Sequence, residues 1–222
     1  GMTDVYDSLK KYGKRVINRL FDNDILGEKT ITGHCIHVNG TEMDILKETN
    51  TMVVHNPESN MGNAVGCPPT MEMIHRGLTV GLGTGSRGTG KTTCAKILAK
   101  AANCLHKHNL CDPTAAWSEV PYMLFEGNPA IGARFFEKKL GALEPGAAAD
   151  IIVTDYDPLT PLSADNVNGH TLFGMSGRQT VTTVIDGKVR MKDRELVGID
   201  EREVLAKSRE QAEKMWARIN AR

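Results

Sequence analysis

One short segment of the chain has the residue spacing of a phosphate-binding loop. Residues 85–92, GSRGTGKT, fit the pattern G-x-x-x-x-G-K-[ST] and lie between an apolar stretch and a predicted helix. Gly85 and Gly90 would let the backbone wrap a phosphate, Lys91 would reach the terminal phosphates, and Thr92 would hold Mg²⁺. This pattern favours Mg-ATP binding. The simpler interpretation is a glycine-rich turn beside an ordinary solvated lysine.

Several histidines lie where they could act on a substrate or a metal. His34 is in the β-rich stretch 30–38, TITGHCIHV, and His55 ends the apolar stretch TMVVH. His34 and His37 are three residues apart, so on a strand they would face opposite sides and could not bind one metal. On a helix, His106 and His108 would be about 200° apart, so they could not chelate an ion together, and we expect both to be solvated.

The elements that must position these residues alternate in type. Apolar, β-rich stretches predict three strands, and amphipathic spacing predicts a helix after each one. This order indicates a parallel sheet with crossover connections. The expected strands are 30–38, 51–55 and 78–84. The expected helices are 4–21, 41–48 with Thr41 as N-cap, 70–76, 92–108, 113–126 and 128–137.

The pattern changes after Gly141. A strand at ADIIVTDYD is followed by a β-hairpin, VTTVIDGKVRMKD, in which Asp186-Gly187 signals a type I′ turn. An amphipathic helix over 200–220 follows. We therefore expect an α/β domain over 1–140, including segment 85–105, and a β-rich domain with a terminal helix over 141–222.

Composition narrows the possible partners. The 222 residues include 27 Lys plus Arg and 27 Asp plus Glu, so the net charge is zero. This balance argues against nucleic acid or an anionic membrane as a partner. No apolar run approaches the roughly 18 residues of a membrane span. The five cysteines form no C-x-x-C pair, which favours reduced thiols and a cytoplasmic location.

Five segments, in order along the chain, together resemble the C-terminal half of a metal-dependent amidohydrolase of the SsnA-type aminohydrolases and chlorohydrolases. They are GHCIHVNGTEMDIL, VVHNPESNMGNAVGCPP, LTVGLGT, LGALEPGAAADIIVTDYDP and VTTVIDGKVRMKDREL. The resemblance implies a partial (β/α)₈ TIM-type barrel, with its last strands only, plus part of a small β-sandwich and a C-terminal helix. By the same resemblance, His34 is catalytic at the end of the sixth strand, and His55, Asn56 and Asn60 bind a small heterocyclic substrate.

The resemblance also defines what this chain lacks. The family binds zinc or iron through histidines on the first and fifth strands and an aspartate that ends the eighth. This chain begins after the fifth strand should have ended, and Gly85 stands at the aspartate position. A catalytic zinc site needs about three protein ligands, so we expect no metal site and no activity from this chain alone. The first strand would also leave an open barrel edge, which favours homo-oligomers.

Segment 85–105, GSRGTGKTTCAKILAKAANCL, instead resembles the phosphate-binding loop of the bacterial DNA polymerase III clamp-loader gamma/tau subunit. Three hypotheses remain open on the sequence. The chain is part of a hydrolase acting on non-peptide C–N bonds, a nucleotide-binding module, or a non-catalytic remnant.

Overall fold

The computed structural model describes residues 1–83, 93–176 and 179–221, and their contacts form two units. The first unit comprises Gly1–Ala148 and Tyr156–Arg178, and the second comprises Ala149–Asp155 and Gln179–Arg222. Residues 156–178 thus return to the first unit after a single strand of the second. This division differs from the boundary at residue 141 expected from the sequence.

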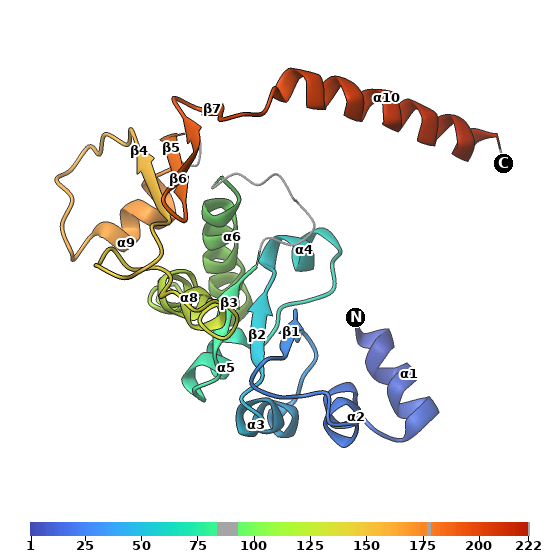
Figure 1. Ribbon diagram of the computed structural model, residues 1–222. Helices are drawn as coiled ribbons and strands as arrows, with labels where there is room; N and C mark the ends of the chain where they lie inside the picture. The colour runs from blue at the N-terminus through green and yellow to red at the C-terminus, as the bar shows by residue number, and fades with distance from the viewer. Residues whose placement is uncertain (84–92, 177–178, 222) are drawn as a thin grey trace. The chain divides into compact units, whose positions relative to one another are not determined.

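The first unit is built on a three-stranded parallel sheet in the order β1-β2-β3 (Figure 1). Ile31 pairs with Met52, and Val53 pairs with Val80, so β2 is hydrogen-bonded along both edges. Helices connect the strands, which confirms the expected alternation and an α/β fold. The elements are β1 (Ile31–Gly33), α3 (Gly40–Glu48), β2 (Met52–His55), α4 (Pro57–Gly62), α5 (Thr70–His75) and β3 (Val80–Leu82).

Two helices precede the sheet where the sequence predicted one. The expected helix over 4–21 is divided into α1 (Met2–Tyr12) and α2 (Val16–Asp22). Gly13 causes the break, because its φ of 67° is left-handed and its N–H donates to the carbonyl of Leu9. Glycine adopts this conformation without the steric cost of a side chain, which makes it a common helix terminator.

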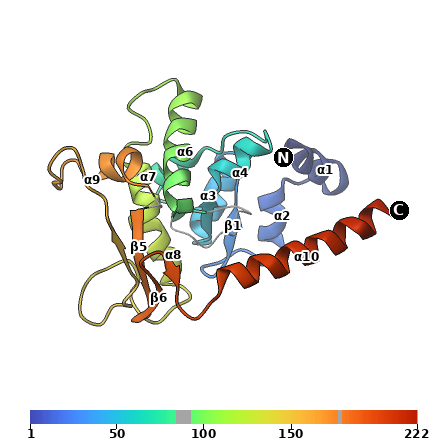
Figure 2. The same ribbon diagram turned by 90° about the horizontal axis from the view of Figure 1, so that it is seen from above.

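One long helix and several short ones follow the sheet. The single helix expected over 92–108 is confirmed as α6 (Thr93–Leu110), which contacts α4 and β3 (Figure 2). The helices expected over 113–126 and 128–137 are shorter than predicted. The remaining elements are α7 (Glu119–Tyr122), the π-helix η1 (Met123–Gly127), α8 (Asn128–Gly132), α9 (Val167–Gly169) and the π-helix η2 (His170–Gly174).

Gly127 allows η1 to lie directly on β3. A Cβ atom at this position would lie 2.0 Å from the carbonyl oxygen of Val80, which is part of the strand backbone. Because a backbone oxygen inside a sheet cannot move aside, no larger residue fits there without displacing the helix.

The apolar core of the first unit lies between the strands and the surrounding helices. Leu46, Met73 and Val80 have no exposed surface, and alanines of α6 complete the same cluster. Within the described ranges, no helix combines the length and the apolar character needed to cross a membrane.

A buried carboxylate joins the start of α3 to α2. Glu42 and Asn39 form a capping box, in which each side chain accepts from the other residue's backbone N–H at 3.1 and 2.9 Å. The same carboxylate accepts from Arg15 Nε at 2.7 Å and from the backbone N–H of Ile17 at 3.2 Å. The N-cap is therefore Asn39, and the expectation of Thr41 was wrong.

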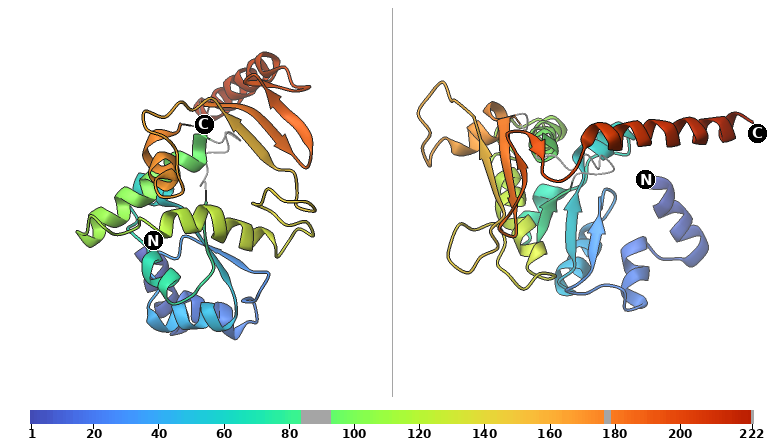
Figure 3. Two further views of the ribbon diagram at one scale, coloured as in Figure 1. Left: turned by 90° about the vertical axis from the view of Figure 1, so that its left-hand side faces the viewer. Right: turned by 45° about the horizontal axis from the view of Figure 1, so that its top comes forward.

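The second unit is a four-stranded antiparallel sheet in the order β4-β5-β6-β7, followed by a helix (Figure 3). Asp186 and Gly187 both have left-handed φ values, 47° and 74°, as a type I′ turn requires. The predicted hairpin and terminal helix are confirmed. The elements are β4 (Ile151–Thr154), β5 (Thr180–Ile185), β6 (Lys188–Lys192), β7 (Glu195–Leu196) and α10 (Glu201–Asn220).

The contacts of Glu42 predict an unusually costly substitution. Glu42→Ala should lower the free energy of unfolding by about 2 to 3 kcal/mol, because it removes a helix cap and leaves the half-buried Arg15 without its counter-ion. Urea unfolding followed by circular dichroism measures the change. Glu48→Ala, on the exposed face of the same helix, is the matched control and should stay within about 0.5 kcal/mol of the wild type. Equal effects of the two substitutions would contradict this account.

Candidate active site

The candidate site lies where two neighbouring parallel strands end. His34 follows the last residue of β1, and His55 is the last residue of β2. Parallel strands have their carboxyl ends at one edge of the sheet, so the two histidines project from the same edge. Ligands of α/β folds bind outside this edge.

The backbone at His34 is strained. His34 and Cys35 have left-handed φ values of 68° and 44°, and the N–H of His34 donates to the carbonyl of Val54 at 2.9 Å. The strand therefore ends at Gly33, so the argument that His34 and His37 lie on opposite faces of one strand does not apply. Left-handed backbone at non-glycine residues costs about 1 to 3 kcal/mol and is concentrated at functional sites.

Asn60 holds the side chain of His34. The Nδ1 atom of His34 lies 2.6 Å from Oδ1 of Asn60. Since an amide oxygen can only accept, His34 carries a proton on Nδ1, and its Nε2 keeps a lone pair when the ring is neutral. Asn60 is completely buried, and its Nδ2 has no hydrogen-bond partner. A buried amide with an unused donor is expected where a ligand completes the bonding.

Asn56 fixes the backbone beside this pair. It is buried, and its Nδ2 donates to the carbonyl of Val54 at 3.2 Å. Gly83, just beyond β3, makes room for it, because a Cβ there would lie 2.4 Å from Asn56 Oδ1. The structure thus places Asn56 between the ends of β2 and β3. Asn60, in contrast, contacts His34.

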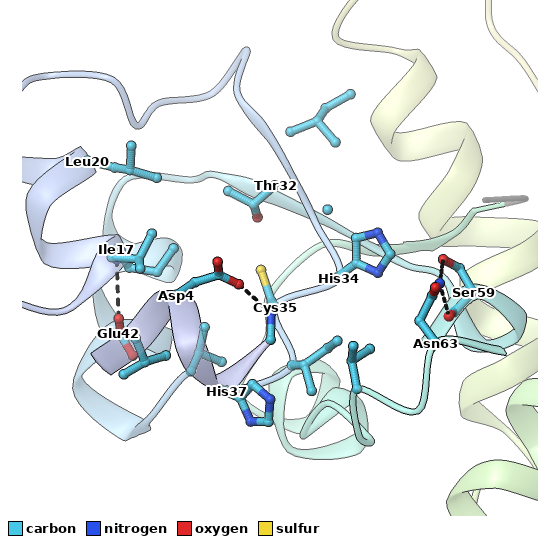
Figure 4. A pocket seen from close by; sticks show the side chains of 18 residues that line it. Asp4, Ile17, Leu20, Thr32, His34, Cys35, His37, Glu42, Ser59 and Asn63 are labelled. Atoms are coloured by element: carbon cyan, nitrogen blue, oxygen red, sulfur yellow. Dashed lines mark hydrogen bonds and ion pairs between the residues drawn. The ribbon is translucent and has the colours of Figure 1, made fainter. Parts of the chain in front are cut away.

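A pocket of about 650 Å³ lies beside His34 (Figure 4). Its walls come from α1, α2, β1 with the loop that follows, and α4. Eight of its 18 lining residues are Val, Ile or Leu, and Asp4, His37 and Glu42 are among the charged or titratable ones. Burial raises the pKa of the Cys35 thiol in this wall, so Cys35 is a protonated, unreactive group at neutral pH.

His55 forms an unexpected pair with His106 of α6. Their Nε2 atoms are 3.1 Å apart, and the exposed fractions of the two residues are 1% and 2%. The expectation that His106 is solvated was therefore wrong, whereas His108 is exposed. His106 shares its helix face with Ala99, Ala102 and Asn103. This three-and-four spacing of small residues was the sequence signal for an inward face.

Both rings of the pair are neutral at pH 7. Burial, together with the neighbouring His106 and His34, lowers the pKa of His55 to about 3. Burial likewise lowers the pKa of His106 to about 4, which Glu119 partly opposes. The Nδ1 atom of His55 is buried and has no hydrogen-bond partner.

The described residues do not fit a zinc or iron centre. Among the side chains that the structure describes, no three from His, Cys, Asp or Glu are close enough together to hold a metal ion. Cys67 lies next to the histidine pair, with its sulfur 3.5 Å from Nδ1 of His106. That atom faces away from the Nε2 edge that meets His55, so the three donors cannot share one ion.

The sequence also contains a pair of residues, not predicted above, whose spacing is relevant to acid–base chemistry. His55 and Glu58 are three residues apart, as in an H-x-x-E motif, and Glu58 lies half-buried in the first turn of α4. The loop predicted to bind a nucleotide, with Gly85, Gly90, Lys91 and Thr92, lies outside the described residues.

Comparison with known proteins assigns the class. A sequence model of the amidohydrolase family matches residues 2–190, which is most of the chain and includes the site just described. The chain therefore belongs to the amidohydrolase family. The match also runs through segment 85–105, so the clamp-loader resemblance of that segment is not supported.

Two relatives are about 30% identical to the chain over nearly its whole length. The chain is 31% identical over 214 residues to a 5′-deoxyadenosine deaminase of Methanosarcina mazei, covering 96% of this chain and 48% of that protein. It is 32% identical over 210 residues to a 5-methylthioadenosine/S-adenosylhomocysteine deaminase of Syntrophomonas wolfei, covering 94% and 48%. The chain thus spans about half the length of the curated relatives it matches.

Solved structures share the fold. An adenosine deaminase from Xanthomonas campestris with bound zinc matches with a TM-score of 0.85 and 24% identity, over 97% of this chain and 49% of that one. The zinc complex of the atrazine chlorohydrolase TrzN from Arthrobacter aurescens matches with a TM-score of 0.75 and 22% identity, over 92% and 45%. At these identities the similarity concerns the fold alone.

The histidine pair predicts loss of stability in acid. Unfolded histidine binds a proton below about pH 6.5, whereas the folded rings stay neutral down to about pH 3 and 4. The free energy of unfolding should therefore fall as the pH drops from about 6.5 towards 4, by up to about 1.4 kcal/mol per pH unit for each ring.

Urea unfolding at several pH values measures this slope. His106→Gln should reduce it, and His108→Gln, at an exposed position two residues away, should not. A stability that is constant over this range, or an unchanged slope in His106→Gln, would contradict the neutral buried pair.

Proposed function

We infer that the chain is the C-terminal half of an aminohydrolase that removes the amino group of an adenosine-type nucleoside or a similar small heterocycle. Its three parallel strands would be the last strands of a barrel. The single observation that carries this proposal is the match to nucleoside deaminases over nearly the whole chain. The position of His34 and His55 at the carboxyl ends of adjacent strands supports it, since α/β barrels act at this edge.

The described residues are suited to binding and orienting the reactants. Hydrolytic deamination adds water to the ring carbon that bears the amino group, and the C–N bond then breaks to release ammonia. The Nδ1–H of His34 donates to Asn60. Nε2 of His34 is therefore available to accept a hydrogen bond from the attacking water or from the substrate. The unused amide protons of Asn60 suit an acceptor atom of the substrate.

The metal expected for the family would be held outside the described residues. These residues supply no group of three ligands, and one catalytic metal requires about that number. We therefore expect this chain alone to bind substrate without turning it over. Zinc or iron would become bound only together with residues that the described part of the chain does not contain.

Binding and turnover test the two parts of the proposal separately. Isothermal titration of the chain with 5′-deoxyadenosine and 5′-methylthioadenosine should show binding, and His34→Gln should weaken it about tenfold, since a lost hydrogen bond to a buried partner costs about 1 to 3 kcal/mol. His108→Gln is the matched control and should bind as the wild type does.

Ammonia release in the presence of added zinc provides the second measurement. The chain alone should release none. Measurable ammonia release would contradict the expectation that the metal ligands lie outside the described residues. The absence of binding to every nucleoside tested would contradict the proposed substrate class.

A further inference from the structure

Three side chains from separate segments form a hydrogen-bonded row that includes His55 of the candidate site. Cys67 precedes α5, His106 belongs to α6, and His55 ends β2. The sulfur of Cys67 lies 3.5 Å from Nδ1 of His106, and Nε2 of His106 lies 3.1 Å from Nε2 of His55. The row ends at Nδ1 of His55, a buried atom with no partner.

The row admits two proton arrangements. Each neutral imidazole has one N–H and one lone pair, so one ring must donate to the other across the 3.1 Å contact. If His55 donates, His106 must direct its own Nδ1–H at the sulfur of Cys67. If His106 donates, its Nδ1 accepts from the thiol, and the proton of His55 is on Nδ1.

The chemistry of the thiol favours the second arrangement. Sulfur is a weak acceptor, whereas an imidazole lone pair is a strong one. Burial raises the pKa of Cys67 to about 11, so an S–H proton is present at neutral pH. The carbonyl of Pro68, 3.6 Å from the sulfur, is a competing acceptor. If the thiol donated to this carbonyl, it would no longer fix the tautomer of His106.

We propose that Cys67 and His106 hold His55 as the tautomer protonated on Nδ1, so that His55 offers a neutral N–H donor to an acceptor atom of the substrate. The acceptor would be an uncharged ring nitrogen or a hydroxyl or carbonyl oxygen. His106 and Cys67 are positioning residues, because they act through His55. The inference rests on the proposed function only in assigning the acceptor to the substrate.

The missing partner of His55 supports this assignment. A buried N–H without a partner is costly in a folded protein, and a ligand acceptor at Nδ1 would remove that cost. In this tautomer Nε2 of His55 accepts from His106 and Nδ1 carries a proton, so neither nitrogen has a free lone pair. The arrangement therefore assigns His55 to hydrogen bonding with the substrate and not to metal ligation.

Nitrogen-15 NMR of the chain labelled at histidine tests the tautomers directly. Long-range ¹H–¹⁵N correlations distinguish protonated from unprotonated ring nitrogens, and the single variants His55→Gln and His106→Gln assign the signals. At neutral pH we expect Nδ1 of His55 and Nε2 of His106 to carry the protons. The reverse pattern, or a mixture of both tautomers on either ring, would overturn the proposal.

Substitutions of Cys67 test its part in the row. Cys67→Ser keeps a hydrogen-bond donor and should preserve both tautomers, whereas Cys67→Ala removes the donor and should cause loss of the single tautomer at His106. Cys104→Ala, an exposed cysteine on α6, is the control and should leave the spectrum unchanged. If Cys67→Ala does not fold, the wild-type and Cys67→Ser spectra still show whether each ring is held as the expected tautomer. An unchanged His106 in folded Cys67→Ala would overturn the role of the thiol.

Addition of 5′-deoxyadenosine tests the donor role. In the wild type the Nδ1 signal of His55 should shift on saturation, while the exposed His108 signal should not. Binding detected by calorimetry without a shift at His55 would overturn the donor role and leave the proposed function intact. A chain that has the expected tautomers but binds no nucleoside would contradict the proposed function.

Discussion

The central position of β2 determines much of this structure. Because β2 is hydrogen-bonded to β1 on one edge and to β3 on the other, the residue at its carboxyl end is enclosed by protein on both sides. That residue is His55, a polar ring with 1% of its surface exposed. A buried polar group needs a partner; His106 provides one for Nε2 of His55, and Cys67 in turn contacts the other ring nitrogen of His106. The packing of α6 and the path of the chain before α5 are both constrained by this requirement.

The types of the elements could be predicted from the sequence, but several of their limits could not. Apolar runs and helical spacing predicted the parallel strands, the hairpin at Asp186-Gly187 and the terminal helix. Periodicity is blind to single backbone conformations, so it missed the break at Gly13 and the end of β1 before His34. In both cases a left-handed residue ends the element, and only one of the two is a glycine.

The candidate site was predictable in part for a similar reason. His34, His55, Asn56 and Asn60 were selected through a family resemblance, and the structure brings His34 and Asn60 into contact. His106 was missed because its importance depends on a contact with a residue 51 positions away. Local spacing marked its helix face as buried but could not indicate what it would meet there. The phosphate-loop pattern is the opposite case, in which a short motif suggested a resemblance that the family match does not support.

The backbone conformation of His34 opposes the stability of the fold to the role proposed for its side chain. A left-handed φ of 68° is accommodated best by glycine, which would relieve the local strain and also remove the imidazole. A chain selected for stability alone would therefore tend to replace this histidine, as happens where active-site strain trades against folding. The residue type at position 34 would thus distinguish two kinds of selection, since a glycine there would be explained by folding, whereas the catalytic role proposed for His34 would explain a histidine in this conformation.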